Sequence, residues 1–145
     1  MNTKKHKSTP FVLDGSVTLA WCFPDERAPY PQAVLDSLAQ TNAYVPSLWR
    51  LEVANALLVG ERRKRCTQAD TATWLALLDA LPVQVDDLTD IRAWSDTLSL
   101  ARSHQLSVYD AAYLELAIRL KLPMAVLDER LKAAAISMGI AEYRP

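Results

Sequence analysis

The chain has 145 residues, and half of them are hydrophobic, which suits a single globular domain with one sizeable core. Its 16 basic and 17 acidic side chains leave a net charge of -1, so a strongly basic surface is excluded and any nucleic-acid contact must come from a local patch. The two cysteines, Cys22 and Cys66, are too few for a disulfide framework and lie in no zinc-binding spacing.

The beginning of the chain carries no recognisable secretory signal, because the basic start is followed by only a short apolar run that contains Asp14. No segment approaches the length that a membrane span requires, so we expect a cytoplasmic protein with no membrane contact. Residues 1–9, with Lys4, Lys5 and Lys7, are expected to form a flexible basic N-terminus, and residues 10–145 to fold as one domain.

Short apolar strands alternate with helical patterns along the whole chain. Strands are predicted at 10–13, 43–45, 83–85 and 123–127, and helices at 16–21, 31–38, 47–61, 70–81, 90–104, 107–118 and 129–138. This alternation predicts an α/β domain with a mostly parallel central sheet that is flanked by helices on both faces.

Local signals add detail to several of these helices. Ser16 and Ser47 are expected to be N-caps, and Gly139 a C-terminal stop. Two helices show apolar residues at helical spacing, which predicts their buried faces. These residues are Leu51, Ala54, Leu57 and Leu58 in one helix, and Ile91, Trp94, Leu98 and Ala101 in the other.

The helix at 107–118 is apolar nearly all round, apart from Asp110 in its first turn. Such a helix should lie inside the domain, and an acid on a buried helix needs a partner. Ser107 and Asp110 have the spacing of a capping box, which is the simplest explanation of the acid. Thr67 and Asp70 have the same spacing elsewhere, and there we predict a cap and nothing more.

Three other acids stand at corresponding places in the predicted sheet. Asp14 and Asp128 directly follow the first and the last strand, and Glu52 lies in the first turn of the helix after the second strand. Each of them alone has a simpler explanation as a cap, a turn residue or a complement to a helix dipole. In a parallel sheet, however, the strand ends and the following helix starts share one edge, so the four acids are predicted to converge there.

Four carboxylates packed together repel one another, and a hard divalent cation relieves that repulsion. Mg²⁺ and Mn²⁺ both prefer oxygen ligands, and Mg²⁺ commonly combines one or two carboxylates with water and substrate phosphate oxygens. A site of this kind activates water for phosphodiester cleavage. The acids therefore favour a Mg²⁺ site, with Mn²⁺ as the alternative ion.

Four segments resemble the motifs of the PIN-domain family, and among its members the VapC-type toxins of bacterial VapBC toxin–antitoxin pairs. These segments are Phe11-Val-Leu-Asp14-Gly-Ser-Val17, Leu51-Glu52-Val-Ala-Asn55-Ala-Leu57, Ser107-Val-Tyr-Asp110-Ala-Ala-Tyr-Leu-Glu-Leu-Ala117 and Val126-Leu-Asp128-Glu-Arg-Leu131. The resemblance extends over nearly the whole chain, in the order of the family. It implies a Mg²⁺-dependent endoribonuclease domain at 10–145, with a parallel sheet and an acidic pocket.

Carried over by position, the resemblance implies that Asp14, Asp110 and Asp128 hold the metal. Glu52 completes the pocket and orients or deprotonates water, so the four acids form the catalytic set. Ser16 and Asn55 are expected to supply supporting hydrogen bonds. The family often has a Thr two residues before the last acid, where this chain has Val126, so the chain lacks that hydroxyl beside Asp128.

The resemblance also implies partners, namely an RNA substrate, a VapB-type antitoxin lying across the pocket, and a second copy in a homodimer. The basic run Arg62 to Arg65 either guides RNA phosphates or is a solvated helix end. The four tryptophans, Trp21, Trp49, Trp74 and Trp94, are expected in core or interface packing, although Trp49 lies close enough to Glu52 to suggest exposure near the site.

Three alternative functions were weighed against the nuclease. A phosphoacceptor domain needs a second acid beside Asp14 and a late lysine, and a haloacid-dehalogenase-like phosphatase needs an Asp where Ser16 stands. A catalytically inactive interaction module, which keeps the fold and binds metal or a partner without RNA turnover, is the remaining alternative.

Overall fold

The computed structural model describes residues 9–145, so the basic stretch with Lys4, Lys5 and Lys7 lies outside the described residues. The strands are β1 (Phe11–Leu13), β2 (Ala43–Val45), β3 (Val83–Val85) and β4 (Met124–Ala125). The helices are α1 (Gly15–Cys22), the 3₁₀ turn η1 (Pro24–Glu26), α2 (Pro29–Ser37), α3 (Trp49–Arg62), α4 (Gln68–Ala80), α5 (Thr89–Arg92), the π-helical turn η2 (Ala93–Thr97), α6 (Leu98–His104), α7 (Val108–Leu120) and α8 (Glu129–Ser137).

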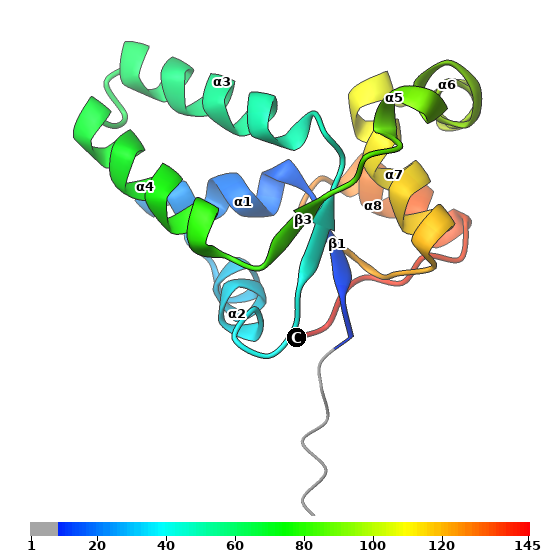
Figure 1. Cartoon of the computed structure of the whole chain (residues 1–145), viewed down its shortest axis with the longest axis horizontal. Coiled ribbons are helices and arrows are strands. Elements are labelled where there is room, and N and C mark those ends of the chain that lie inside the picture. The colour runs from blue at the N-terminus through cyan, green and yellow to red at the C-terminus, as the bar shows by residue number, and fades with distance from the viewer. Residues whose placement is uncertain (1–8) are drawn as a thin grey trace, which may run out of the picture.

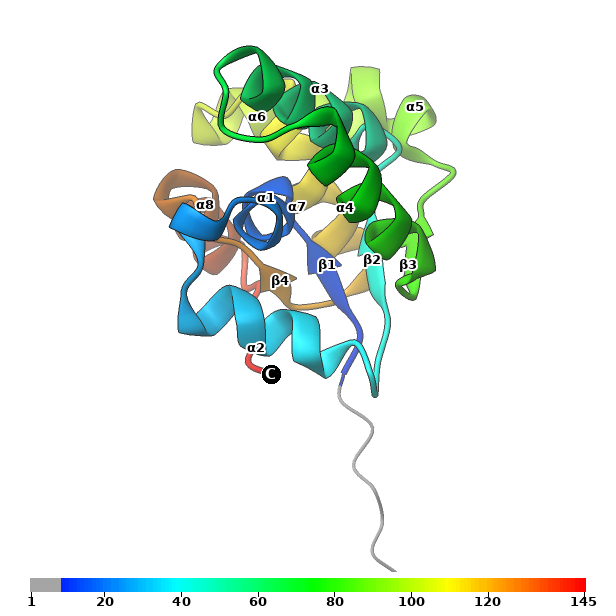
Figure 2. The same ribbon diagram turned by 90° about the vertical axis from the view of Figure 1, so that its left-hand side faces the viewer.

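The four strands form one sheet in the order β3-β2-β1-β4, and every neighbouring pair is parallel. Figure 1 shows α1 to α4 on one face of this sheet and α5 to α8 on the other, and Figure 2 shows the strands side by side behind α1 and α4. The predicted α/β domain with a parallel sheet covered on both faces is therefore confirmed. Within residues 9–145, no helix is long and apolar enough to cross a lipid bilayer.

The sheet is buried because its strands are apolar on both sides. All three residues of β1 are completely buried, and Met124 and Ala125 of β4 pair with Val12 and Leu13. The helix α7 packs behind β1, and its residues 111–117 are all buried. The prediction that this apolar helix lies inside the domain is confirmed.

The two predicted apolar faces are correct only in part, because Leu57 and Ala101 are buried whereas other residues of each face are exposed. Leu51 on α3 is 75% exposed, because α3 instead turns Trp49, Val53 and Leu57 toward the core. Trp94 is 92% exposed, because the predicted helix at 90–104 is interrupted by the π-helical turn η2. The wider turn shifts the phase of the helix, so its two ends do not share the face that a regular period predicts.

Several local signals were also misread. The N-cap of α1 is Asp14 rather than Ser16, and α3 begins after Leu48, while the N–H of Ser47 donates to Oγ1 of Thr89. The last strand is limited to Met124–Ala125 rather than extending to 127. Gly139, with φ 77°, does follow the end of α8 as predicted.

The tryptophans divide between core and surface. Trp21 and Trp49 are buried, and Trp74 is packed partly against the core. Trp49 is thus not exposed near the site: its Nε1 donates to Oγ1 of Thr18 over 3.0 Å inside the domain. For Trp94, on the exposed side of η2, the predicted core packing is wrong.

A partly buried ion-pair network fixes the far end of α7. The guanidinium of Arg119 donates to both carboxylate oxygens of Asp86, over 3.1 and 2.7 Å, and to both of Glu115, over 2.8 and 3.1 Å. All three side chains are at most 16% exposed. Burial raises the pKa of Asp86, but the bonds from Arg119 outweigh it and hold the pKa below its usual value. The network ties α7 to the segment that joins β3 to α5.

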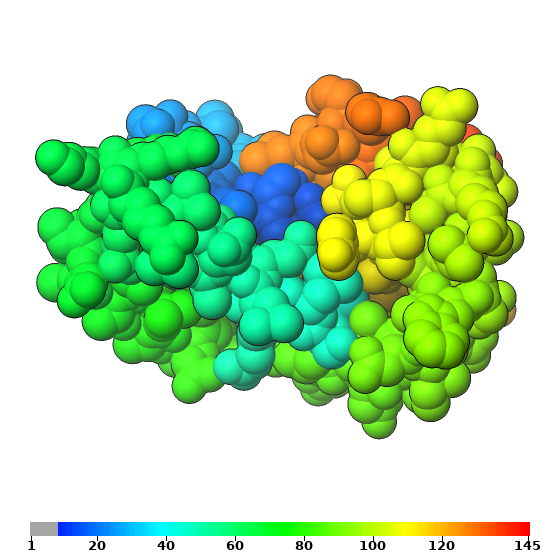
Figure 3. Space-filling model, turned by 90° about the horizontal axis from the view of Figure 1, so that it is seen from above, coloured from blue at the N-terminus to red at the C-terminus, as the bar shows by residue number. Residues whose placement is uncertain are grey.

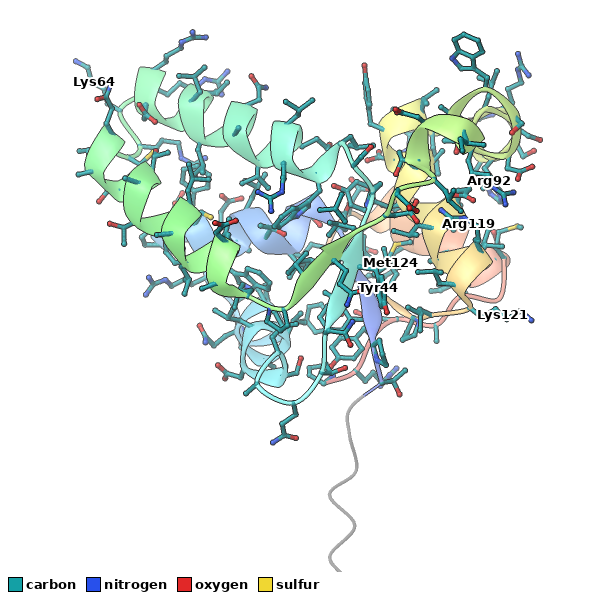
Figure 4. All side chains as sticks on the ribbon, in the orientation of Figure 1. Tyr44, Lys64, Arg92, Arg119, Lys121 and Met124 are labelled. Carbon is teal, nitrogen blue, oxygen red and sulfur yellow. The ribbon has the colours of Figure 1, made fainter. Side chains whose placement is uncertain are left out.

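We expect Arg119→Ala to lower the free energy of unfolding by about 2–3 kcal/mol, because the buried Glu115 and the partly buried Asp86 both lose their cation. Arg92, labelled with Arg119 in Figure 4, is a matched control, because its pair with Asp96 is at the surface. We expect Arg92→Ala to cost less than about 1 kcal/mol. Urea denaturation of the three proteins measures both effects, and equal losses would contradict a special role of the partly buried network.

Candidate functional site

The four predicted acids line one cleft at the carboxyl edge of the sheet. The cleft has a volume of about 370 Å³, and its lining residues are Asp14, Gly15, Ser16, Leu19, Glu52, Val53, Asn55, Ala56, Asp110 and Asp128. Figure 3 looks onto this edge and shows the start of α1 in blue at the bottom of a hollow, with α3, the start of α7 and the start of α8 around it. All six site residues expected from the sequence are therefore brought together.

Asp14 is the most deeply placed of the four acids, with 5% exposure. Its backbone N–H bonds to the carbonyl of Ala125 on β4, and its carboxylate caps α1 by accepting from the N–H and the hydroxyl of Ser16. The hydroxyl contact is short, at 2.5 Å. A carboxylate at this N-cap sits in the positive field of the first turn of α1.

Ser16 links two sides of the cleft. Its Oγ donates to Asp14 and accepts from the N–H of Leu127 over 3.0 Å, directly before Asp128. One hydroxyl thus holds the loop after β4 against the start of α1. The expected supporting hydrogen bonds of Ser16 are present, whereas Asn55 lies exposed at the cleft and its contribution stays a prediction.

Glu52, on the first turn of α3, is oriented from α7. The hydroxyl of Tyr113 donates to Oε1 of Glu52 over 2.6 Å. Tyr113 is 1% exposed, and burial followed by contact with Glu52 raises its pKa, so the phenol keeps its proton and remains a donor. It also lies close to Gly15, where an added Cβ would be 3.6 Å from the Tyr113 hydroxyl.

Tyr113 is the residue of the site that sequence reasoning missed. Its position three residues after Asp110 on the same helix places both side chains on one face, and that spacing was the available signal. The tyrosine was instead interpreted as one of the apolar residues of the helix. A buried tyrosine usually finds a partner for its hydroxyl, so a polar group facing this side of α7 could have been expected.

Asp110 and Asp70 are not equivalent. At α4, Thr67 and Asp70 form a complete capping box, as predicted for Asp70. At α7, the hydroxyl of Ser107 accepts from the N–H of Asp110 over 3.0 Å, so Ser107 is the N-cap. Asp110 differs from Asp70 in lining the cleft, where Asp128 is close enough to influence its protonation.

Asp128 stands on the rim of the cleft as the N-cap of α8, where Oδ1 accepts from the N–H of Leu131 over 2.9 Å. It is exposed, unlike Asp14. Val126, in the position where the family often has a Thr, is buried. The N–H of the neighbouring Leu127 donates a hydrogen bond to Oγ of Ser16.

The carboxylates disfavour one another's ionisation. Burial first, and then the nearby Asp110, raise the pKa of Asp14 to about 6, although the bonds from Ser16 lower it. Burial and the charges of Asp14 and Asp110 raise the pKa of Glu52, and burial and Asp128 raise that of Asp110. The cleft is thus built so that ionising all of its acids costs free energy unless a cation enters.

The donor set fits a hard divalent cation. Within residues 9–145, no three His, Cys, Asp or Glu side chains are gathered closely enough to ligate one ion together. Mg²⁺ needs fewer, since it commonly takes one or two carboxylates and fills its remaining positions with water or phosphate oxygens. An all-oxygen cleft with mutually repelling carboxylates suits Mg²⁺ and Mn²⁺.

The model of one protein family, described as the PIN domain, matches residues 11–137. The chain belongs to the PIN domain family. PIN domains are generally nucleases, and PIN nucleases typically use divalent metal ions. The matched residues contain all four acids of the cleft, from Asp14 to Asp128.

Solved structures agree on the fold. The crystal structure of PAE2754 from Pyrobaculum aerophilum is similar, with a TM-score of 0.64 and 21% sequence identity over 92% of this chain and 85% of that one. At this identity the likeness concerns the fold alone. No match is found among curated proteins.

The burial of Asp14 leads to a prediction about how the stability of the protein depends on pH. Because the pKa of Asp14 is raised to about 6 in the folded protein, its ionisation disfavours folding. This one group therefore lowers the free energy of unfolding as the pH rises from about 4 through 6, by on the order of 3 kcal/mol. Asp14→Asn removes this loss, so in chelator its free energy of unfolding should exceed that of the wild type at pH 7.5 but not at pH 4. Urea denaturation at both pH values measures this.

The matched control for this prediction is Asp70→Asn, which replaces an exposed capping acid. The free energy of unfolding of Asp70→Asn, relative to that of the wild type, should not rise with pH as that of Asp14→Asn does. If the free energies of unfolding of Asp14→Asn and the wild type differ by the same amount across the pH range, the ionisation of Asp14 does not destabilise the folded protein.

Proposed function

We propose that this PIN domain is a Mg²⁺-dependent endoribonuclease, with Mn²⁺ as an alternative ion, and the VapC-type toxin of a VapBC toxin–antitoxin pair. The observation that carries the proposal is the convergence of Asp14, Glu52, Asp110 and Asp128 from separate elements into one cleft. Burial and mutual repulsion raise the pKa values of Asp14, Glu52 and Asp110, which disfavours the folded state and is poorly suited to a merely structural role.

In this proposal Asp14, Asp110 and Asp128 hold the metal, partly through water. A bound divalent ion lowers the pKa of its water and offsets the negative charge that develops on the phosphate. Asp14 is fixed at the bottom of the cleft by Ser16, whereas Asp128 stands exposed on the rim, so the two carboxylates would offer metal ligands from different depths.

Glu52 orients the attacking water and accepts its proton. The hydrogen bond from Tyr113 holds Oε1, and within residues 9–145 no hydrogen-bond donor is recorded for Oε2. The raised pKa of Glu52 makes it a stronger base than an ordinary carboxylate. The water oxygen then bonds to phosphorus, the bond from phosphorus to the leaving ribose oxygen breaks, and that oxygen takes up a proton from solvent, to which Glu52 returns the proton that it accepted.

The proposed partners are RNA, a VapB-type antitoxin that covers the cleft, and a second copy of the chain in a cytoplasmic homodimer. The basic run at the end of α3 is a less direct RNA contact than the sequence suggested. Arg65 is paired with Asp25 and Glu26, and Lys64 lies just beyond the far end of α3 in Figure 4. The last residue of α3, Arg62, is about 15 Å along the helix from Glu52. Phosphate contact by this run stays a prediction.

We expect the purified protein to cleave a mixed RNA pool with Mg²⁺ or Mn²⁺ and not with chelator. Asp110→Asn should lower the cleavage rate by roughly 100-fold or more, because the variant loses a metal ligand. Asp70→Asn is the control, since Asp70 occupies the same helical position but belongs only to a capping box. Gel electrophoresis of end-labelled RNA measures the rates.

Two outcomes of this experiment would overturn the proposal. Equal cleavage by Asp110→Asn and wild type would mean that the activity does not come from this cleft. Metal binding without cleavage of any RNA would favour the inactive interaction module.

Metal binding is measurable without turnover. An ion that binds only the folded protein raises its stability by about 2.7 kcal/mol at a hundred times its dissociation constant. We therefore expect saturating Mg²⁺ to raise the midpoint of thermal unfolding of the wild type and of Asp70→Asn by several degrees. A protein with both Asp14→Asn and Asp110→Asn should show little change, and an equal rise in all three would place the bound ion elsewhere.

A further inference from the structure

We propose that Arg130 binds a phosphate group of the RNA at the cleft, on the side formed by the starts of α7 and α8. This inference rests on the proposed nuclease function, because it assigns a cation to the substrate of that site. It is carried by the position of Arg130 between the two segments that bear Asp110 and Asp128.

Arg130 lies on the first turn of α8, two residues after Asp128. Its Nη2 donates to the backbone carbonyl of Gln105 over 3.0 Å. Gln105 ends α6 in a left-handed conformation, with φ 54°, and lies two residues before Ser107, the N-cap of α7. The guanidinium therefore spans from the segment of Asp128 to the segment that leads into Asp110.

The guanidinium is held but not neutralised. Within residues 9–145 its one recorded hydrogen bond goes to an uncharged carbonyl, and it takes part in no ion pair. Four of its five N–H donors therefore remain available, and the side chain is exposed. Arg65 and Arg119, by contrast, form ion pairs with carboxylates.

The charge of Arg130 lies beside two of the four acids, because its side chain joins the segment of Asp128 to the segment that leads into Asp110. An anionic substrate must approach a cleft of four acids, and a cation on the rim reduces the repulsion that it meets.

The chemistry of the group suits this task. A planar guanidinium offers paired N–H donors that match two phosphate oxygens, and such charge-assisted bonds are stronger than neutral ones. The bond to Gln105 restrains the side chain before substrate arrives, so less conformational entropy is lost on binding. A donor fixed beside a phosphate also stabilises the charge that its oxygens gain during hydrolysis.

RNA affinity tests this inference separately from cleavage. Binding of a fluorescein-labelled, unstructured oligoribonucleotide is measured by anisotropy in Mg²⁺, in the Glu52→Gln background to prevent turnover. We expect Arg130→Ala to weaken binding about 5- to 10-fold at low salt and to reduce the slope of log affinity against log salt by about 0.7. Arg130→Lys should keep most of the slope, because it keeps the charge.

The control is Arg144→Ala, which removes an exposed arginine next to the C-terminus, at the opposite end of the sheet in Figure 1. It should leave both affinity and slope unchanged. Equal affinities and slopes for Arg130→Ala and Arg144→Ala would overturn the inference. So would a change in Mg²⁺ affinity alone, since Arg130 would then act only on Asp110.

Cleavage rates of the proteins that keep the natural Glu52 add a second measurement. We expect Arg130→Ala to lower kcat/KM by roughly 100-fold, with Arg130→Lys in between. If the wild type cleaves no RNA but Arg130→Ala still binds it more weakly, the nuclease proposal fails and the phosphate contact stands. If the wild type cleaves RNA and Arg130→Ala matches it in binding and rate, the nuclease proposal stands and the phosphate contact by Arg130 fails.

Discussion

The mutual repulsion of carboxylates in one cleft is the constraint on which this structure depends. Parallel strands end at a common edge, and each of β1, β2 and β4 is followed there by an acid or by a helix that carries one. Asp14 is buried, and both its burial and its neighbour Asp110 oppose its ionisation. The domain therefore has to tolerate a site that destabilises it, which is a common feature of places where proteins perform chemistry.

The scaffold around the cleft limits this cost with specific donors. Ser16 bonds to Asp14 and to the loop after β4, and Tyr113 bonds to Glu52. At the other end of α7, Arg119 is locked between Asp86 and Glu115. The helix that carries Asp110 and Tyr113 is thus held along its length, by apolar packing in the middle and by a partly buried ion pair near its end.

The residues of the site were predictable because they lie at the ends of apolar segments. A continuous apolar run followed by an acid marks both a buried strand and its functional edge, as at Phe11 to Asp14. The faces of the outer helices were less predictable. A regular period placed Trp94 in the core, but the π-helical turn η2 changes the phase, and nothing in the composition of residues 93–97 signals it.

By itself, the sequence determined the alternation of strands and helices, the parallel sheet and the convergence of four acids, because these follow from local hydrophobic patterns and from the geometry of parallel strands. Only the tertiary structure decided which groups meet across the cleft. The bonds from Tyr113 to Glu52, from Leu127 to Ser16 and from Arg130 to Gln105 join residues 61, 111 and 25 positions apart. Such contacts depend on how whole elements pack, and no local period encodes them.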